Sequence, residues 1–480
     1  MSSFYCLHLP SNRYVKNGSQ IAYHRNLKKM TITTYNPYTG KALKNYEQLD
    51  KVQVEKQLRK TETASKKWSG TNIKERIVII ENVAVILEKN KKRYATLISK
   101  EMGKPVTEGI AEVEKCVLLC NYYAKNAESF LADEIIKTDA TKSFVRYAPI
   151  GTVLAVMPWN YPFWQVFRFA IPTLVAGNAA LLKHGSNVLG SGEEIQKIFK
   201  QAGLPKDVFT HIIVDYKLLS YVLEDDAVQG VSLTGSEAAG ASIAAIAGKN
   251  LKRCVLELGG SNAVIICDDA DLNAAVEVAV KARMQNSGQS CIAGKRLLIQ
   301  EKIYDAFITK FKDAVSNLVS GNPLLPKTQV GPLAKKDIAA DLQKQIRQSV
   351  KKGAKILLGG KRNDNYHEPT ILVDVQPGMQ AFDEETFGPL AVCTKISSVE
   401  EGFELAAKSR FGLGLTICTA NTKKALQYSH LVPDGSYFIN EKVTSHPELP
   451  FGGTKKSGYG RELSKSGLQE FINKQTVYVK

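Results

Sequence analysis

One cysteine of this chain stands in a setting that suits nucleophilic chemistry. The stretch QNSGQSCIAGKR, residues 285–296, is small and polar, and it presents Cys291 directly after a long amphipathic run. Ser287 and Gly288 favour a tight turn with close backbone approach. A thiol there is open to a small electrophile, and its own backbone N–H points near the same place. Alone, the pattern also fits a small buried hydrophobe, the commoner role of cysteine.

Two further polar side chains stand where predicted strands end. In PWNYP, residues 158–162, prolines on both sides fix the backbone around Asn160. Its amide could donate to a developing alkoxide, or it could be a turn asparagine. In LELGGS, residues 256–261, Glu257 lies between two leucines. Partial desolvation there raises the pKa of the carboxyl toward that of a usable base, whereas a structural glutamate held by backbone amides is the alternative.

Two other stretches suit a nucleotide. LTGSEAAG, residues 233–240, predicts a strand, a sharp turn and a helix start, without GxGxxG or P-loop spacing. A helix N-terminus offers free N–H groups to phosphate and Ser236 adds a hydroxyl, although a plain N-cap explains the pattern equally well. In EETFGP, residues 384–389, Glu385 could bind ribose hydroxyls and Phe387 could pack against a flat ring.

Composition places the chain among soluble globular proteins. Its 480 residues predict two large domains, and no apolar run approaches the length of a membrane span. The eight cysteines show no paired spacing and no CxxC, and the seven histidines do not cluster with them. We therefore expect neither disulfides nor a metal site, no membrane partner, and a reducing, cytoplasmic location.

The net charge of +17 raises the question of nucleic acid. Residues 1–30 hold five Lys and Arg and no acid, while the rest of the excess is scattered. No basic run interleaves with aromatic residues, so we expect no specific nucleic-acid partner but a solvated basic surface that helps to attract an anionic cofactor or substrate. TITTYNPYTGK after Met30 is typical of a natural amino terminus, and residues 1–30 are predicted to be an N-terminal extension.

The order of predicted elements indicates an α/β fold. Residues 48–132 have helical periodicity and residues 133–148 alternate as extended structure. From residue 152 short apolar runs alternate with helical segments, which predicts an open sheet that binds a nucleotide at its strand ends. A second α/β series occupies 296–440. The first series of predicted strands is 152–157, 179–183, 208–214, 228–234, 254–258 and 263–267.

In this order and spacing, the motifs resemble the aldehyde dehydrogenase superfamily from about residue 33 to the C-terminus. PFGGTKKSGYGRE, residues 450–462, matches that family too. MPWNYPFWQVFR and LLKHGSN are most similar to the branch that contains bacterial succinate-semialdehyde dehydrogenases. The intact set of Asn160, Glu257 and Cys291 argues against a catalytically silent protein on this fold.

The resemblance implies a Rossmann-like cofactor domain, an α/β catalytic domain and a small β ribbon that makes homodimers or homotetramers. The corresponding ranges are 31–132 and 148–255 for the cofactor domain, 256–467 for the catalytic domain, and 133–147 with 468–480 for oligomerisation.

The resemblance also assigns roles to residues. Cys291 is the nucleophile, Asn160 and the Cys291 N–H hold the oxyanion, and Glu257 activates the water that hydrolyses a thioester. The expected cofactor is NAD or NADP. The family positions that contact it correspond to Trp159 on the adenosine side, Lys183 and Glu385 at the two riboses, Ser236 at the pyrophosphate, and with them Ser186, Gly235 and Phe387.

Departures from the family pattern bear on specificity. Many NAD-specific members carry a glutamate where Ser186 stands; its absence removes repulsion toward a 2′-phosphate, so NADP is permitted here. Many succinate-semialdehyde enzymes place an arginine at the position of Gln285; here Arg283 lies nearby, and the other arginine of that pocket matches Arg168. The thiol that some redox-regulated members place two residues after the nucleophile is Ala293 here.

The expected substrate is succinate semialdehyde, with another small aliphatic or aromatic aldehyde as the alternative. Arg168 is a cation within the apolar run FWQVFRFA, residues 163–170. An unpaired buried charge is costly, so Arg168 either pairs with an acid, extends to solvent, or binds the distal carboxylate of a semialdehyde.

Overall fold

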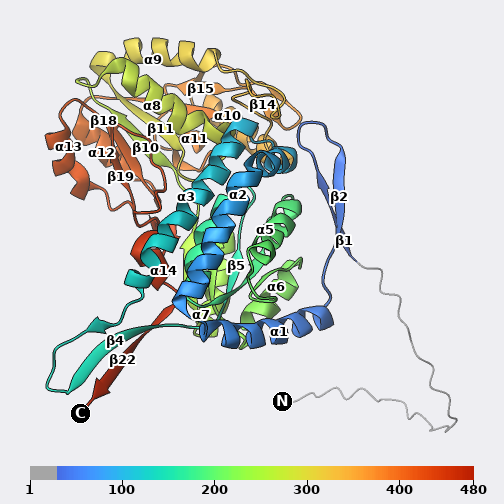
Figure 1. Cartoon of the computed structure of the whole chain (residues 1–480). Coiled ribbons are helices and arrows are strands. Elements are labelled where there is room, and N and C mark those ends of the chain that lie inside the picture. Colours follow the sequence, from blue (N-terminus) through green and yellow to red (C-terminus); the bar gives the residue numbers. More distant parts are fainter. Residues whose placement is uncertain (1–29) are drawn as a thin grey trace, which may run out of the picture.

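The computed structural model describes residues 30–480, and the predicted extension at residues 1–30 lies outside that range except for Met30. Two open sheets lie one above the other in the view of Figure 1. The first has six strands in the order β21-β9-β8-β5-β6-β7, parallel except for β21. Their bounds are β5 (Thr152–Val156), β6 (Ala179–Lys183), β7 (Phe209–His211), β8 (Val228–Thr234), β9 (Arg253–Glu257) and β21 (Gly458–Tyr459).

The second sheet has seven strands in the order β12-β15-β16-β11-β10-β18-β19, parallel except for β12. It is covered by α8 (Leu272–Met284) and α9 (Glu301–Ser316) on one face and by α10 (Lys336–Lys351) and α12 (Val399–Ala407) on the other. The strands are β10 (Asn262–Ile266), β11 (Gly294–Gln300), β12 (Lys355–Leu358), β15 (Thr370–Val373), β16 (Leu390–Ile396), β18 (Leu415–Cys418) and β19 (Tyr437–Ile439).

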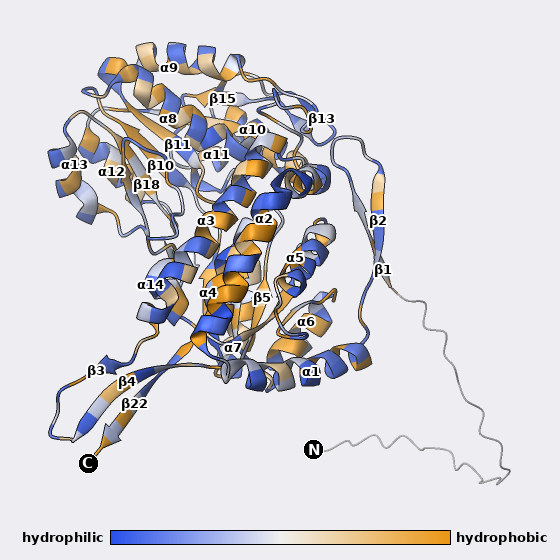
Figure 2. Ribbon diagram, viewed as in Figure 1, coloured by the Kyte–Doolittle hydropathy of each residue, from blue (hydrophilic) through white to orange (hydrophobic). Residues whose placement is uncertain are grey.

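Alternation along β5 explains how helices cover both faces of the first sheet. Val153 and Ala155 face one apolar cluster and Leu154 faces another, because successive side chains of a strand point to opposite faces. Figure 2 shows β5 and the neighbouring α4 strongly hydrophobic. The first face is packed by α2 (Ile73–Met102), α3 (Val106–Phe130), α4 (Trp164–Val175) and α5 (Leu189–Gln201), and the second by α1 (Lys51–Ser69), α6 (Tyr216–Glu224) and α7 (Glu237–Lys249).

Shorter elements complete the chain. The helical ones are η1 (Gln285–Gly288), α11 (Gln380–Asp383), α13 (Thr422–Gln427), η2 (Tyr428–Leu431) and α14 (Ser464–Gln469). The extended ones are β13 (Arg362–Asn363), β14 (Tyr366–His367), β17 (Phe411–Gly412) and β20 (Thr454–Lys455).

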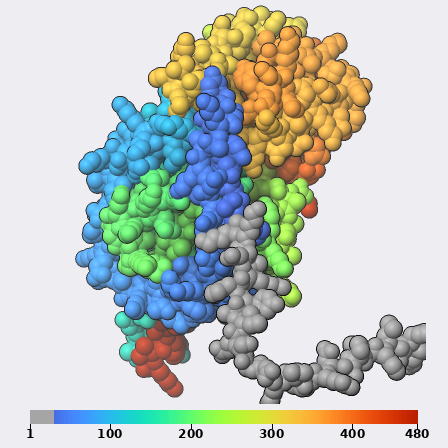
Figure 3. Space-filling view, turned by 90° about the vertical axis from the view of Figure 1, so that its right-hand side faces the viewer, coloured from blue at the N-terminus to red at the C-terminus, as the bar shows by residue number. Residues whose placement is uncertain are grey.

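Two small sheets extend from the main bodies. The segments predicted to mediate oligomerisation pair with each other as β22 (Ile472–Val479), β4 (Lys142–Pro149) and β3 (Glu134–Ile135), an arm that projects in Figure 1. The hairpin of β1 (Thr31–Tyr35) and β2 (Ala42–Glu47) runs toward the seven-stranded sheet, as the dark-blue band in Figure 3 shows. The side-chain amide of Asn365 there donates to the Pro37 carbonyl at 2.7 Å.

The strand that carries Glu257 crosses the predicted division between residues 255 and 256. β9 pairs wholly within the six-stranded sheet, and β21, from the predicted catalytic range, returns to pair with it. The Cys291 loop leads instead into β11 of the seven-stranded sheet. Glu257 and Cys291 are therefore supplied by different sheets. Across residues 30–480, no group of His, Cys, Asp or Glu is arranged to hold a metal, and no helix has the apolar length that a bilayer requires.

Candidate active site

The loop before Cys291 has an unusual backbone. In η1 (Gln285–Gly288), Asn286 and Ser287 have φ of 57° and 52°, and Gly288 follows with φ of 71°. A Cβ at Gly288 would lie 2.2 Å from the Gly388 carbonyl oxygen, so only glycine fits there. The predicted tight turn and close approach are confirmed. Two consecutive left-handed residues other than glycine were not anticipated, and such backbone persists only when its surroundings hold it.

Buried hydrogen bonds hold this loop. The backbone N–H of Asn286 donates to Glu108 Oε2 at 2.7 Å, and its side-chain amide donates to the Asn160 carbonyl at 2.9 Å. Ser287 Oγ donates to the Gly331 carbonyl at 3.1 Å. The loop that presents the thiol is thus tied to α3 and to the PWNYP turn.

Arg283 has a structural role rather than the substrate-binding one suggested by its sequence position. Its side chain is completely buried, and its guanidinium donates to the carbonyls of Gly288 at 3.3 Å and Leu390 at 2.5 Å. It also donates to the Gly388 carbonyl. Arg283 therefore does not replace the arginine that Gln285 lacks.

Lys295 was not identified from the sequence and is central to the site. The side chain is completely buried in β11, and its ammonium donates to the Cys291 carbonyl at 2.9 Å and to Glu385 Oε1 at 2.8 Å. A third hydrogen bond goes to the Gly260 carbonyl. The available signal was a lysine at the start of the predicted strand that contains LLI, residues 297–299, because a charge in a buried strand needs partners.

The Cys291 thiol lies at one side of a cavity. Burial raises the pKa of the thiol to about 11, while the positive charges of Lys295 and Arg168 oppose this shift. The thiol is therefore protonated at neutral pH in the absence of bound ligands, and attack by its sulfur requires a base.

Asn160 is fixed with its amide N–H groups toward this loop. Its Oδ1 accepts a hydrogen bond from Gln165 Nε2 at 3.1 Å, and its Nδ2 donates to the Gln289 carbonyl at 3.1 Å. A side-chain amide carries two N–H donors, so one stays available for an oxyanion.

Glu257 has the environment predicted for a base. Its side chain is 1% exposed, and neither carboxyl oxygen has a hydrogen-bond partner in the described part of the chain. Burial and the nearby Glu462 raise its pKa to about 8, and the charges of Arg168 and Arg461 limit the rise. A carboxyl in this state can accept a proton from water near neutral pH.

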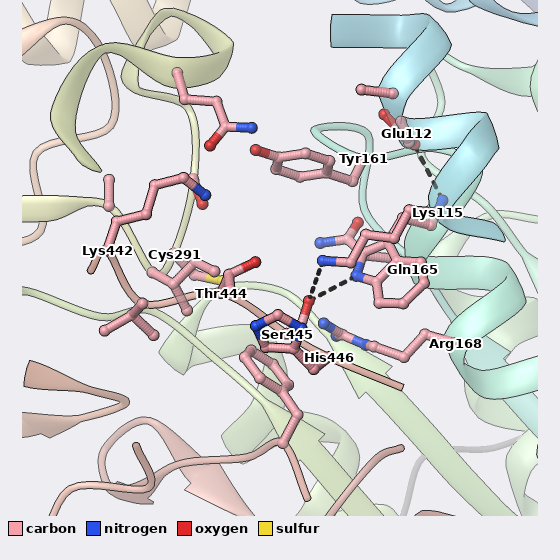
Figure 4. Close-up of a pocket in the computed structure, with 18 of the residues that line it drawn as sticks. Glu112, Lys115, Tyr161, Gln165, Arg168, Cys291, Lys442, Thr444, Ser445 and His446 are labelled. Atoms are coloured by element: carbon pink, nitrogen blue, oxygen red, sulfur yellow. Dashed lines mark hydrogen bonds between the residues drawn. The ribbon is translucent and has the colours of Figure 1, made fainter. Parts of the chain in front are cut away.

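A cavity of about 320 Å³ adjoins Cys291 (Figure 4). Arg168 lines it from α4, and its Nε forms a buried ion pair with Glu462, an acid that was not identified from the sequence. The guanidinium carbon also lies 4.7 Å from the centre of the Phe451 ring. Other lining residues include Glu108, Lys115, Tyr161, Trp164, Gln285, Lys442, Ser445 and His446.

Four of the residues predicted to bind the cofactor lie after the carboxyl ends, or at the end, of β6 and β8, the two strands that flank β5. Lys183 ends β6, Ser186 follows in the next loop, and Gly235 with Ser236 separates β8 from α7. Ser236 is the N-cap of α7, and its hydroxyl accepts from Ala239 N at 3.3 Å. A cation, hydroxyls and a helix N-terminus are the donors that phosphate groups need, so this edge fits a dinucleotide.

The second sheet contributes the other predicted contacts. Glu385 lies between α11 and β16 and accepts from Gly260 N at 3.1 Å. The rings of Phe387 and Trp159 meet edge to face, with centroids 5.7 Å apart. The position of Trp159 on the adenosine side stays a prediction.

The sequence and the fold match known proteins. The chain matches the model of the aldehyde dehydrogenase family over residues 24–477, and it belongs to that family. It is 43% identical over 453 residues to the "Probable succinate-semialdehyde dehydrogenase", named for NADP(+), of Synechocystis sp., which covers 94% of this chain and 100% of that protein. The chain is an NAD(P)-dependent aldehyde dehydrogenase.

Two further relatives are similar over nearly their whole length. The Escherichia coli succinate semialdehyde dehydrogenase Sad, named for NAD(P)+, is 41% identical over 458 residues, covering 94% of this chain and 99% of that protein. The crystal structure of succinic semialdehyde dehydrogenase from Streptococcus pyogenes in complex with NADP+ superposes with a TM-score of 0.91 at 36% identity. It covers 93% of this chain and 99% of that one.

We predict that Cys291→Ala abolishes aldehyde oxidation but leaves cofactor binding intact, because the thiol is the predicted nucleophile and is not among the residues predicted to bind the cofactor. Steady-state reduction of NAD(P) and a separate cofactor titration measure the two effects. Cys116→Ala, at a completely buried position of α3, is the control and should lose stability rather than turnover. Turnover by Cys291→Ala above background would place the nucleophile elsewhere.

We predict that Glu257→Gln slows thioester hydrolysis most. Rapid mixing should then show a burst of one equivalent of reduced cofactor before turnover stalls. Because the base form of a carboxyl with a pKa of about 8 is lost as pH falls, wild-type turnover should also decline below about pH 8, and this dependence should be absent in the variant. A slow first reduction without a burst would instead make Glu257 the base that activates Cys291.

Proposed function

We propose that this enzyme oxidises succinate semialdehyde to succinate. The observation that carries the proposal is the guanidinium of Arg168 in the wall of the cavity that adjoins Cys291. Its Nε is engaged by Glu462, but a guanidinium has further N–H donors that can pair with a carboxylate. The names of the relatives above support the same substrate.

The apolar part of the cavity supports a second candidate. The rings of Trp164 and Phe451 also line it, and they would accept the body of an uncharged aldehyde. Another small aliphatic or aromatic aldehyde is therefore the runner-up. The response of charged and neutral substrates to the loss of one cation distinguishes the two.

The proposed mechanism begins with the protonated thiol. Water accepts the proton of Cys291, and the sulfur forms a bond to the aldehyde carbon while the carbonyl electron pair moves to oxygen. The free amide N–H of Asn160 and the backbone N–H of Cys291 stabilise this oxyanion. When bound, the oxidised nicotinamide supplies the acceptor for the hydride that leaves the carbon.

Loss of the hydride leaves a thioester on Cys291. Glu257 then removes a proton from water, whose oxygen attacks the thioester carbon, and the acid is released as the sulfur regains a proton. The dry, partner-free environment of the Glu257 carboxyl supports this role, because a base with a pKa of about 8 can both accept and return a proton near neutral pH.

Assembly through the three-stranded arm is part of the proposal. Large apolar side chains are exposed on it, among them Ile135 at 69% and Tyr478 at 52%. Exposed apolar groups on a projecting β arm favour burial against a partner. A homodimer or homotetramer is the expected form.

We predict that Ser186→Glu raises the KM for NADP far more than that for NAD. Ser186 is exposed on the loop after β6, where a serine hydroxyl can donate to a 2′-phosphate and a carboxylate would repel it. Initial-rate measurements with both cofactors test this. Equal effects on the two KM values would show that position 186 does not sense the phosphate.

The test of Arg168 must allow for its ion pair, because removing the cation alone leaves Glu462 buried and unpaired next to Glu257. We therefore compare Arg168→Gln/Glu462→Gln with Glu462→Gln alone. Relative to Glu462→Gln, the double variant should show a KM for succinate semialdehyde that is higher by about one to two orders of magnitude. This rise corresponds to roughly 1.5–3 kcal/mol of charged hydrogen bonding. The KM for butanal should stay nearly constant; parallel losses on both substrates would make Arg168 purely structural.

A further inference from the structure

A second cation reaches the substrate cavity from α3. The ammonium of Lys115 donates to Ser445 Oγ at 2.8 Å and lies 4.3 Å from the centre of the Trp164 ring. Figure 4 shows Lys115, Ser445 and Arg168 close together on the side of the cavity away from Cys291. Three groups that can donate hydrogen bonds therefore meet at this end.

The partners of Ser445 decide what its hydroxyl can do. Its oxygen accepts from Lys115 at 2.8 Å and also from Trp164 Nε1 at 3.1 Å. A hydroxyl oxygen has two lone pairs, and both are used by these donors. The hydroxyl hydrogen of Ser445 is thus left to donate, and the ligand that suits it is an acceptor.

The charge of Lys115 is unbalanced within the protein. Among the described residues, no acidic side chain lies within ion-pair distance of its ammonium. Glu112, one turn away on the same helix, is paired with Lys104 and accepts from Phe163 N at 2.9 Å and Trp164 N at 3.0 Å. Burial and the charges of Arg168 and Lys442 lower the pKa of Lys115 to about 7. An anionic ligand would supply the missing countercharge.

We propose that Lys115 determines specificity for the charged substrate, because its ammonium and the Ser445 hydroxyl bind the distal carboxylate together with Arg168. This inference rests on the proposed oxidation of succinate semialdehyde. Beside Arg168, Lys115 then supplies the cation that Gln285, which also lines the cavity, does not provide. A carboxylate has acceptor sites for all three donors, whereas the methyl end of butanal has none.

The test compares Lys115→Met and Lys115→Gln with wild type on succinate semialdehyde and butanal. Methionine removes both charge and hydrogen bond, and the KM for succinate semialdehyde should rise about 10- to 100-fold, with kcat nearly unchanged. Glutamine can still donate to Ser445 without a charge, so the KM of Lys115→Gln for succinate semialdehyde should lie between those of wild type and Lys115→Met. Retention of the wild-type KM by Lys115→Gln would overturn a role for the charge.

Two controls separate binding from folding. Lys125→Met removes the same charge from an exposed position of α3 and should leave both substrates unaffected. Lys115→Met places an apolar chain beside Trp164, so butanal turnover and the thermal midpoint should be retained. Equal losses on succinate semialdehyde and butanal would show that Lys115 is merely structural.

A pH series gives an independent readout. The ratio of kcat/KM for succinate semialdehyde to that for butanal should fall as pH rises through about 7, since Lys115 then loses its proton. The ratio cancels the titrations of Cys291 and Glu257, which act on both substrates. Other charged or titratable groups around Lys115 and its cavity are Arg168 on α4, Glu108, Glu112 and Cys116 on α3, and Lys442 and His446 on the loop after β19. Burial raises the pKa of Glu108 to about 7, so this carboxyl titrates in the same range.

Lys115→Gln removes the contribution of Lys115 and keeps that of Glu108, so a fall in the ratio as large in this variant as in wild type would overturn the inference. The two proposals also fail differently. A wild-type enzyme whose kcat/KM for butanal equals that for succinate semialdehyde would overturn the proposed substrate and the role of Lys115 together. A preference for succinate semialdehyde that Lys115→Met retains would overturn the role of Lys115 alone.

Discussion

A single buried ammonium, that of Lys295, joins the parts of the active site. It donates to the carbonyls of Cys291 and Gly260 and to the carboxylate of Glu385. A lysine has three N–H donors, so all of them are used, and a charge with no access to water requires this. The nucleophile loop, the segment after β9 and the Glu385 loop must therefore adopt their positions together.

Neighbouring charges also act on the pKa of Glu257, the proposed base. Glu257 and Glu462 are both buried, and the guanidinium of Arg168 is shared between an ion pair with Glu462 and the cavity wall. Burial and the nearby Glu462 keep the pKa of Glu257 raised, and the charges of Arg168 and Arg461 limit the rise. Arg168 thus affects the strength of the base as well as the proposed recognition of the substrate.

The residues predicted from sequence are those in short continuous motifs. Cys291, Asn160 and Glu257 follow strands or turns whose apolar pattern is local, and most strands of the first sheet lie within a residue or two of their predicted ends. β7 is shorter than predicted, Phe209–His211, and β21 was not predicted. The strand predicted at 263–267 as part of the first series is β10, which belongs to the seven-stranded sheet. The helix expected to begin after Asp271 does so, with that carboxylate accepting from Ala274 N at 2.9 Å.

What could not be predicted depends on contacts between distant segments. Glu462 meets Arg168 only after the C-terminal segment packs beside α4, and Arg283 binds carbonyls more than a hundred residues later in the chain, at Gly388 and Leu390. The left-handed backbone of Ser287 has no local signal, because serine does not favour that conformation. Its stabilisation is supplied by neighbours from other elements.

The pairing of β21 with β9 and of β22 with β4 has a consequence for how the molecule forms during synthesis. The six-stranded sheet and the arm each take their last strand from beyond residue 457, and the Pro37 carbonyl can accept its hydrogen bond only once Asn365 has been synthesised. Contacts so distant along the chain close slowly, and they cannot form until nearly all of the polypeptide has left the ribosome. A nascent chain that already contains Asn160, Glu257 and Cys291 therefore carries the catalytic groups before it carries the strands that complete their surroundings.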